Sequence, residues 1–301
     1  MRSTNRPTFF RTRLVALVAI ASVLAAACGD DADLTVEAES PPTTVTTEAA
    51  PPAPVAPPVV PIVVADYLID GLPFPVPPGA VTLELTNNGE DFHHLQLWQV
   101  DDADAAAEAI QAGDLSSLQG GVAIGGVGAI EGLGTIGQVS TVLDPGEYVL
   151  FCLIHTPAGA HNELGMVARL DVAGEPIATD LPETAHELLI SPYGFQLPQD
   201  WDGRAPLTVV NALEWAADAE FLRLADGATR DDFLAFMDGS RPGPPPFTVA
   251  GGVAGLGANR TAVVLDPLDP GDYLVVSFSP DPTADMAPQF STGLLAELAI
   301  R

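Results

Sequence analysis

The stretch "LDPGEYVLFC" at residues 143–152 occurs again, in closely similar form, as "LDPGDYLVVS" at residues 268–277. In each copy an Asp-Pro-Gly turn leads into a run of apolar residues, which is typical of a tight turn followed by a β-strand. The two copies share the turn and the tyrosine, and they end differently, in Cys152 and in Ser277. A unit that recurs along one chain in this way predicts two homologous domains.

Other segments recur in the same order around these two copies. The strands that they predict are short and separated by turn signals, and within residues 61–172 only Asp102 to Gln111 is typical of a short helix. The sequence therefore predicts an all-β protein with two tandem Greek-key β-sandwiches, at residues 61–173 and 181–301. The paired segments are "VTLELTN" (81–87) with "LTVVN" (207–211), "GGVAIGGVGAIEGLG" (120–134) with "VAGGVAGLG" (249–257), and "GMVARLDV" (165–172) with "GLLAELAI" (293–300).

The amino-terminal segment has the pattern of an export signal. Four arginines precede an apolar stretch, from Leu14 to Ala27, that is too short to span a bilayer comfortably and that ends in small residues. The "LAAAC" sequence that ends at Cys28 resembles a bacterial lipoprotein signal; an ordinary secretory signal is the alternative. We expect a signal peptide at residues 1–27, a lipid anchor on Cys28 and a disordered Pro/Thr/Ala-rich tether at residues 28–60. The protein is then exported and held at the extracellular or periplasmic face of the cell membrane.

The chain is strongly acidic, with 11 Lys+Arg against 40 Asp+Glu and a formal net charge of -29. Four of the basic residues lie in the predicted signal, and none is a lysine. Such a surface repels nucleic acid and attracts cationic partners. We therefore expect no nucleic-acid binding. The charge predicts a partner protein with a basic docking face, and the alternative is an adaptation of the whole proteome to solubility or salt.

Cys152 is the one thiol left in the exported chain if Cys28 carries lipid. An unpaired thiol in an oxidising compartment calls for burial or a bound ligand. Residues 151–166, "FCLIHTPAGAHNELGM", place two histidines and a methionine beside it, and "NNGEDFHHLQL" at residues 87–97 adds two more histidines. Thiolate, imidazole nitrogen and thioether are the ligand set that selects copper. The sequence therefore predicts a copper site.

At these residues the chain resembles the cupredoxins, the blue (type 1) copper proteins. The glycine and tyrosine before Cys152 and the Gly165-Met166 pair fit the family pattern over roughly residues 61–173, and the second half looks like a degenerate copy. The resemblance implies one type 1 copper, Cu(I) or Cu(II), bound by a histidine of an early strand and by the cysteine, a second histidine and the methionine of a late strand and its loop. Four protein ligands leave no open position for a substrate, so the implied role is outer-sphere electron transfer.

Two histidines compete for the late ligand position. His161 lies nine residues after Cys152 and five before Met166, a spacing similar to that of the long-loop nitrite-reductase type. His155 lies three residues after Cys152, a spacing similar to that of short-loop members of the family. In those members the methionine follows the histidine after a short gap, whereas Met166 is separated from His155 by a longer one. We expect Cys152, His161 and Met166 to be ligands, with His155 as the alternative.

The early ligand is His93 or His94. Successive side chains of a strand point to opposite faces, so His93 shares a face with Leu95 and Leu97, and His94 shares a face with Gln96. The face with the leucines is the better candidate for the core side. We expect His93 to be the ligand and His94, the alternative, to lie on the surface.

The second half offers an internal comparison for this ligand set. When the repeated segments are aligned, the positions of all four expected ligands are occupied by residues of other types. These are Ala217 for His93, Ser277 for Cys152, Gln289 for His161 and Leu294 for Met166. We therefore expect no metal site in the second half.

A substrate-converting oxidoreductase is not the expected function. Copper nitrite reductases and multicopper oxidases place histidines directly beside the type 1 cysteine, whereas here its neighbours are Phe151 and Leu153. Two alternatives to electron transfer remain at the level of the sequence. One is an exported copper carrier or chaperone, and the other is a structural β-sandwich lipoprotein without a redox role.

Overall fold

The computed structural model of the chain describes residues 55–72 and 75–301. The expected signal peptide (1–27), the expected lipid site Cys28 and most of the expected tether (28–60) lie outside these residues. Among the described residues, no helix has the length and apolar character needed to cross a membrane.

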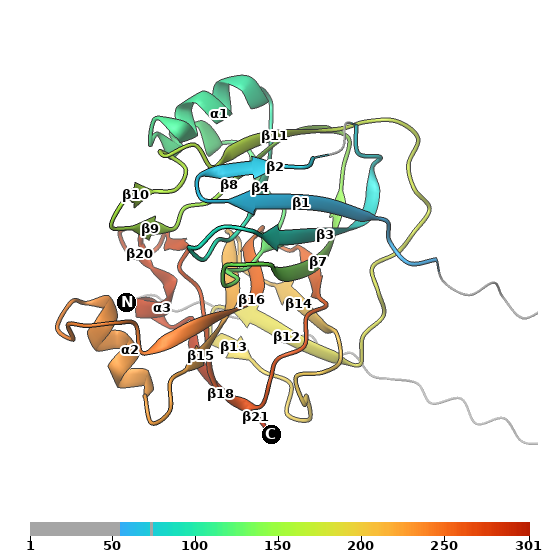
Figure 1. Cartoon of the computed structure of the whole chain (residues 1–301). Coiled ribbons are helices and arrows are strands. Elements are labelled where there is room, and N and C mark those ends of the chain that lie inside the picture. Colours follow the sequence, from blue (N-terminus) through green and yellow to red (C-terminus); the bar gives the residue numbers. More distant parts are fainter. Residues whose placement is uncertain (1–54, 73–74) are drawn as a thin grey trace, which may run out of the picture. The chain divides into compact units, whose positions relative to one another are not determined.

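Two sheets form the first half of the described chain (Figure 1). One has the strand order β2-β1-β3-β7 and the other the order β11-β8-β4-β5. Their apolar inner faces supply the core, in which Leu85, Leu97 and Tyr148 are fully buried. The strands are β1 Val59–Ala65, β2 Leu68–Asp70, β3 Gly79–Asn87, β4 Gln96–Val100, β5 Val122–Ala123, β7 Thr135–Leu143, β8 Gly146–Phe151 and β11 Val167–Val172. Strand β1 thus begins two residues before the expected start of the first domain.

The second half repeats this plan. Its strands take the orders β13-β12-β14-β17 and β21-β18-β15-β16, and the short strand β6 of the first half (Gly126–Val127) is added beside β16. The strands are β12 His186–Ser191, β13 Gly194–Gln196, β14 Leu207–Asn211, β15 Ala217–Leu224, β16 Phe247–Leu256, β17 Thr261–Val264, β18 Gly271–Val276 and β21 Leu295–Ile300. Two hairpins of two-residue strands complete the set: β9 His155–Thr156 with β10 Gly159–Ala160, and β19 Pro280–Asp281 with β20 Ala287–Pro288.

The expected helix is present as α1, Ala103–Gln111, and the side chain of Asp102 caps it by accepting a hydrogen bond from the Ala105 N–H at 2.9 Å. The prediction of one short helix concerned the first half, and α1 is the one α-helix among the described residues of that half. A second α-helix, α2, spans Arg230–Met237, and short helical turns occur at Leu115–Leu118 and at α3, Gln289–Thr292. The signal for α2 is the capping box formed by Thr229 and Asp232, which the sequence displays.

The two halves share one sheet. Strand β7 of the first half pairs antiparallel with β17 of the second, with Val139 opposite Val264 and Ser140 opposite Val263. The resulting eight-stranded sheet, β13-β12-β14-β17-β7-β3-β1-β2, has equivalent strands at equal distances from its centre. The fold is therefore the predicted one, all-β with two tandem Greek-key sandwiches, and the halves are joined through equivalent strands.

The glycine-rich segments also join the halves. Gly126 and Val127 pair with β16, and the Gly128 N–H donates to the Gly252 carbonyl at 2.9 Å. A Cβ atom on Gly128 would lie 2.7 Å from the carbonyl oxygen of Gly251, so a larger residue does not fit without moving a backbone. These glycines permit the close approach of two chain segments.

Asp266 offers a test of the junction. It follows β17, and its Oδ2 accepts the Gln138 N–H of β7 at 2.6 Å. Burial raises the pKa of Asp266 from 3.8 to about 6; the Gln138 hydrogen bond acts against this rise, and the nearby charge of Glu84 adds to it. Because the pKa is higher in the folded state, the stability contributed by Asp266 is complete below about pH 4 and is lost as the pH rises through about 6.

We expect Asp266→Asn, which keeps an oxygen acceptor for Gln138, to increase the free energy of unfolding at pH 8 by roughly 1–3 kcal/mol and to change it little at pH 4. Denaturant unfolding at both pH values measures this. The exposed Asp269→Asn makes the same change of charge and is the control. Equal effects of the two variants at pH 8 would contradict the prediction.

Candidate metal centre

Three side chains from distant parts of the first half meet at one end of its core. The Nδ1 atoms of His93 and His161 are 3.0 Å apart, and the Sγ of Cys152 is 3.6 Å from the Nδ1 of His161. Potential ligand atoms of the three residues all lie within 4.8 Å of one another, and each residue is 0% exposed. Two imidazole nitrogens and one sulfur therefore face a common point.

Backbone hydrogen bonds fix the segments that carry these residues. His93 lies just before β4. Its N–H donates to the Ile130 carbonyl at 3.1 Å, and its carbonyl accepts the Ile130 N–H at 2.9 Å. Cys152 follows the last residue of β8. The His161 N–H donates to the Ile154 carbonyl at 2.9 Å, so the loop after Cys152 folds back on itself. The loop is thus held at the end of the sandwich.

Met166 belongs to the same group by its backbone. Its N–H donates to the His161 carbonyl at 2.9 Å, and its carbonyl accepts the Cys152 N–H at 3.2 Å. Its side chain is fully buried and lies in the same hydrophobic cluster as Cys152. The structure therefore brings together all four expected ligands, His93, Cys152, His161 and Met166.

The two alternative histidines lie outside this group of ligand atoms. His155 is exposed in β9, and its Nδ1 is 3.0 Å from the carbonyl of Leu153. His94 is only 8% exposed, so the expectation of a surface position for it is wrong. Its Nε2 accepts the Leu153 N–H at 2.9 Å, and its Nδ1 lies 3.3 Å from the carboxylate of Glu220. His94 therefore contacts Leu153, the residue after Cys152, and links it to Glu220.

Burial dominates the electrostatics of the site. It raises the pKa of the Cys152 thiol to about 12, against hydrogen bonds from the backbone of His94 and Ile154 that act in the opposite direction. Burial also lowers the pKa of His93, and burial together with the neighbouring His93 lowers the pKa of His161 to about 4. Neutral imidazoles are the form that binds metals, and a bound metal ion replaces the thiol proton. The donor set thus fits a soft metal ion such as copper.

Asp66 is a residue that the sequence gave no reason to include. It forms the turn between β1 and β2 together with Tyr67, and its Oδ1 lies 3.4 Å from the Nε2 of His93. The same carboxylate accepts the N–H groups of Glu90 and Asp91, at 3.1 and 3.2 Å. A carboxylate on the far nitrogen fixes the tautomer in which Nδ1 is free to bind a metal. Asp66 therefore orients His93.

The far nitrogen of His161 has a different environment. His161 Nε2 is buried without a hydrogen-bond partner among the described residues, and the nearest carboxylate oxygen, from Asp91, is 3.9 Å away. The Tyr67 ring stands edge-on to the His161 ring at 5.5 Å between centroids. The turn at Asp66 and Tyr67 thus covers both imidazoles.

The second half reproduces the backbone of this site without its ligands. The Ser277 N–H donates to the Leu294 carbonyl at 3.1 Å, and the Leu294 N–H donates to the Gln289 carbonyl at 2.9 Å, as Cys152, Met166 and His161 do in the first half. Tyr148 and Tyr273 likewise donate to the carbonyls of Asp144 and Asp269. These equivalences align Cys152, His161 and Met166 with Ser277, Gln289 and Leu294. The pairing of β4 with β8 and of β15 with β18 aligns His93 with Ala217.

A network of hydrogen bonds fills the corresponding place in the second half. Asp218, at the position equivalent to His94, is 2% exposed and accepts bonds from the backbone N–H groups of Gly255, Phe278 and Ser279, at 2.7 to 2.8 Å. The Ser277 hydroxyl donates to Gln289 at 2.8 Å. The polar groups at this site therefore bond to one another, and no metal-ligand cluster occurs there among the described residues.

No protein-family model and no curated protein matches the sequence. Solved structures similar to the chain include a dithionite-reduced auracyanin from Roseiflexus castenholzii, with 21% identity, coverage of 40% of this chain and 100% of that chain, and a TM-score of 0.27. Another is auracyanin A, a "blue" copper protein from Chloroflexus aurantiacus, with 22% identity, 39% and 100% coverage and a TM-score of 0.28. A third is a Cu-containing nitrite reductase from Thermus scotoductus, with 14% identity, 81% and 62% coverage and a TM-score of 0.24.

The first half combines a β-sandwich with a group of potential metal ligands at one end. Each half is a Greek-key sandwich of two sheets. In the first half, a histidine before an early strand meets a cysteine, a histidine and a methionine from a late strand and the loop after it. The chain therefore has the two tandem β-sandwiches that the sequence predicted, and its first half has the predicted order of potential ligands.

Proposed function

We propose that His93, Cys152, His161 and Met166 bind one copper ion as a type 1 site, and that the protein transfers electrons outside the cytoplasmic membrane. The observation that carries this proposal is the convergence of two imidazole Nδ1 atoms and one thiol sulfur in a fully buried position. Copper bound there supplies one-electron chemistry by changing between Cu(I) and Cu(II).

The surroundings of these residues favour electron transfer over catalysis. Phe151 before Cys152 is fully buried and packs in a cluster with residues of α1, and Leu153 after it packs against the same cluster. Neither of these neighbours can bind a second metal ion. The burial of all four ligands also keeps a substrate away from the ion, whereas an electron can cross a short distance of packed protein.

The same burial argues against the carrier alternative. A protein that delivers Cu(I) to another protein must let an incoming ligand reach the ion. Here the side chains of His93, Cys152 and His161 are 0% exposed, and the turn at Asp66 and Tyr67 lies over the imidazoles. A resident ion fits this arrangement better than cargo does.

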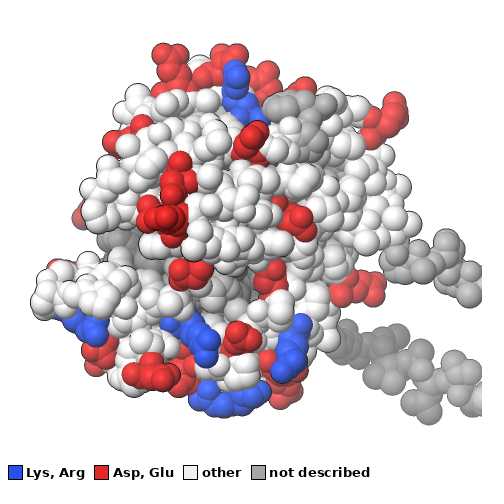
Figure 2. All heavy atoms as spheres, in the orientation of Figure 1, with Lys and Arg blue, Asp and Glu red and all other residues white. Residues whose placement is uncertain are grey.

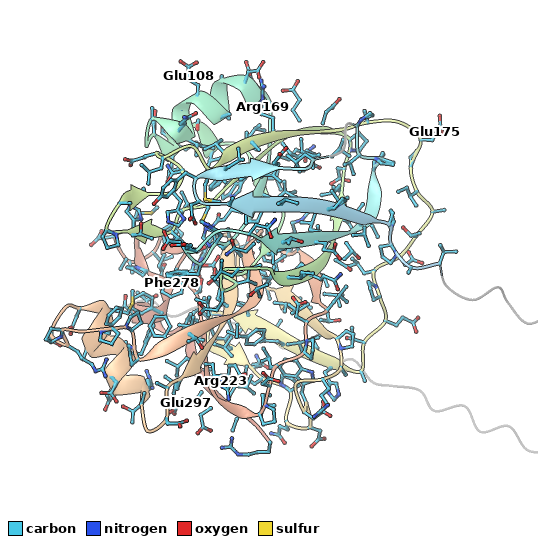
Figure 3. All side chains as sticks on the ribbon, viewed as in Figure 1. Glu108, Arg169, Glu175, Arg223, Phe278 and Glu297 are labelled. Atoms are coloured by element: carbon cyan, nitrogen blue, oxygen red, sulfur yellow. The ribbon has the colours of Figure 1, made fainter. Side chains whose placement is uncertain are left out.

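The charge distribution supports a partner with a basic docking face. Arg169 is the only arginine in the sequence between positions 59 and 172, and the chain has no lysine. It belongs to β11 and pairs with Asp104 of helix α1 (Figure 3). The other arginines of the described chain belong to the second half, which carries most of the blue atoms in Figure 2. The half that carries the metal ligands is therefore the more one-sidedly acidic one, and its charge attracts cationic surfaces.

The proposal places the protein at the outer face of the membrane through lipid on Cys28. Residues between Cys28 and β1 are rich in proline and threonine and contain few apolar periodic positions, which favours a tether. A tethered domain can reach a partner in the membrane or beside it.

A type 1 site predicts an intense visible absorption band at about 600 nm for residues 55–301 loaded with Cu(II). The band arises from charge transfer between the thiolate and the metal. Cys152→Ser removes this band. His161→Ala removes or strongly shifts it, whereas His155→Ala leaves it in place, because His155 is exposed and bonds to its own loop. Visible and electron paramagnetic resonance spectra measure these outcomes. Absence of the band from the unmodified protein would overturn the proposal.

A second prediction concerns the carboxylate that orients His93. We expect Asp66→Ala to weaken copper retention by about 10–100-fold in competition with a chelator, since the His93 ring loses the partner of its far nitrogen. Asp171→Ala, at an exposed position of β11, is the matched control and should retain copper as the unmodified protein does. If the two variants retain copper equally well, Asp66 does not act on the site.

A further inference from the structure

Glu220 of the second half reaches the metal centre of the first half. It lies in β15 and is 4% exposed, and its Oε1 is 3.3 Å from the Nδ1 of His94. A buried carboxylate is costly unless its bonds are made, so the contact with His94 holds Glu220 in a defined position.

The hydrogen bonds of His94 define its tautomer. The Leu153 N–H can only donate, and it points at the Nε2 of His94 at 2.9 Å. Nε2 must therefore accept, and the ring proton of His94 lies on Nδ1, facing the Glu220 carboxylate. Glu220 thereby keeps the ring in the orientation that accepts the bond from Leu153.

The bond between His94 and Leu153 joins two segments that carry expected ligands. His94 follows His93, and Leu153 follows Cys152. A change in the orientation of His94 therefore alters the distance between the early strand and the late loop, and with it the position of the sulfur.

This contact has no counterpart in the opposite direction. Gln96 is the residue of the first half equivalent to Glu220, and Asp218 is equivalent to His94. The Gln96 side chain accepts a bond from the indole N–H of Trp98 at 3.2 Å, and Asp218 bonds to groups of its own half. The repeat alone therefore does not require this contact, since no hydrogen bond between Gln96 and Asp218 occurs among the described residues.

We propose that Glu220 is a positioning residue of the metal centre, which acts through His94 on the Cys152 loop, so that the second half completes the site. This inference rests on the proposed type 1 copper site. It gives the second half a role in the metal centre of the first half.

The test compares Glu220→Met, which keeps the size and removes the acceptor, with Glu220→Gln, which keeps an oxygen acceptor for His94. We expect Glu220→Met to shift the visible band of the Cu(II) protein and to lower copper retention by about 10–100-fold, and Glu220→Gln to restore both. Glu297→Met, at an exposed position in the same sheet (Figure 3), is the control.

A measurement without copper separates this inference from the copper proposal. In the metal-free protein, amide hydrogen exchange at Leu153, followed by NMR, should be at least tenfold faster in Glu220→Met than in the unmodified protein or in Glu220→Gln. If the unmodified protein shows no visible band with Cu(II), the copper proposal fails whatever Glu220 does. If the band is present but Glu220→Met matches Glu297→Met in band, retention and Leu153 exchange, the inference about Glu220 is overturned. If Glu220→Met does not fold, Glu220→Gln decides the question: copper retention and Leu153 exchange like those of the unmodified protein support the inference, and a loss of either overturns it.

Discussion

The metal-binding end of the molecule depends on three backbone hydrogen bonds, from Cys152 to Met166, from Met166 to His161 and from His161 to Ile154. They fold the loop after β8 so that the cysteine, the second histidine and the methionine return to one place. The second half makes the same three bonds, from Ser277, Leu294 and Gln289, with no metal ligands present. The frame therefore belongs to the sandwich and does not require an ion to form it, which is the condition for a ligand set that changes little between two redox states.

The two halves show two ways of filling this frame. A buried cluster of polar atoms is stable only when its atoms find partners. In the second half, the carboxylate of Asp218 and the side chains of Ser277 and Gln289 bond to one another and to the backbone. In the first half, two imidazoles and a thiol face one another, and His161 retains a buried nitrogen without a partner among the described residues. A cation bound by the two Nδ1 atoms and the sulfur would satisfy these facing atoms, while the far nitrogen of His161 would keep its unpaired position. The network of the second half leaves no such need.

Much of the fold and of the site could be predicted from the sequence, because both are encoded by local patterns. The Asp-Pro-Gly-x-Tyr repeat marks equivalent strands, and the alternation around His93 indicates which histidine faces the core. Helix α2 was missed because its apolar pattern is short, although its capping box is visible in the sequence. Asp66, Glu220 and the buried position of His94 could not be predicted. Their contacts join residues that are 27 to 126 positions apart, and no local pattern reports such distances.

The sharing of one sheet explains how the second half can affect a site that it does not contain. Pairing of β7 with β17 and of β6 with β16 makes the halves one body at the level of the backbone. Glycines allow the two chain segments β6 and β16 to approach there. Because β15 lies next to β16, the carboxylate of Glu220 on β15 comes within reach of His94. A second half without metal ligands of its own thus still has a structural role, because removing it would expose the β7 edge and leave His94 without its partner. Loss of ligands and retention of the framework are compatible when the framework supports the remaining site.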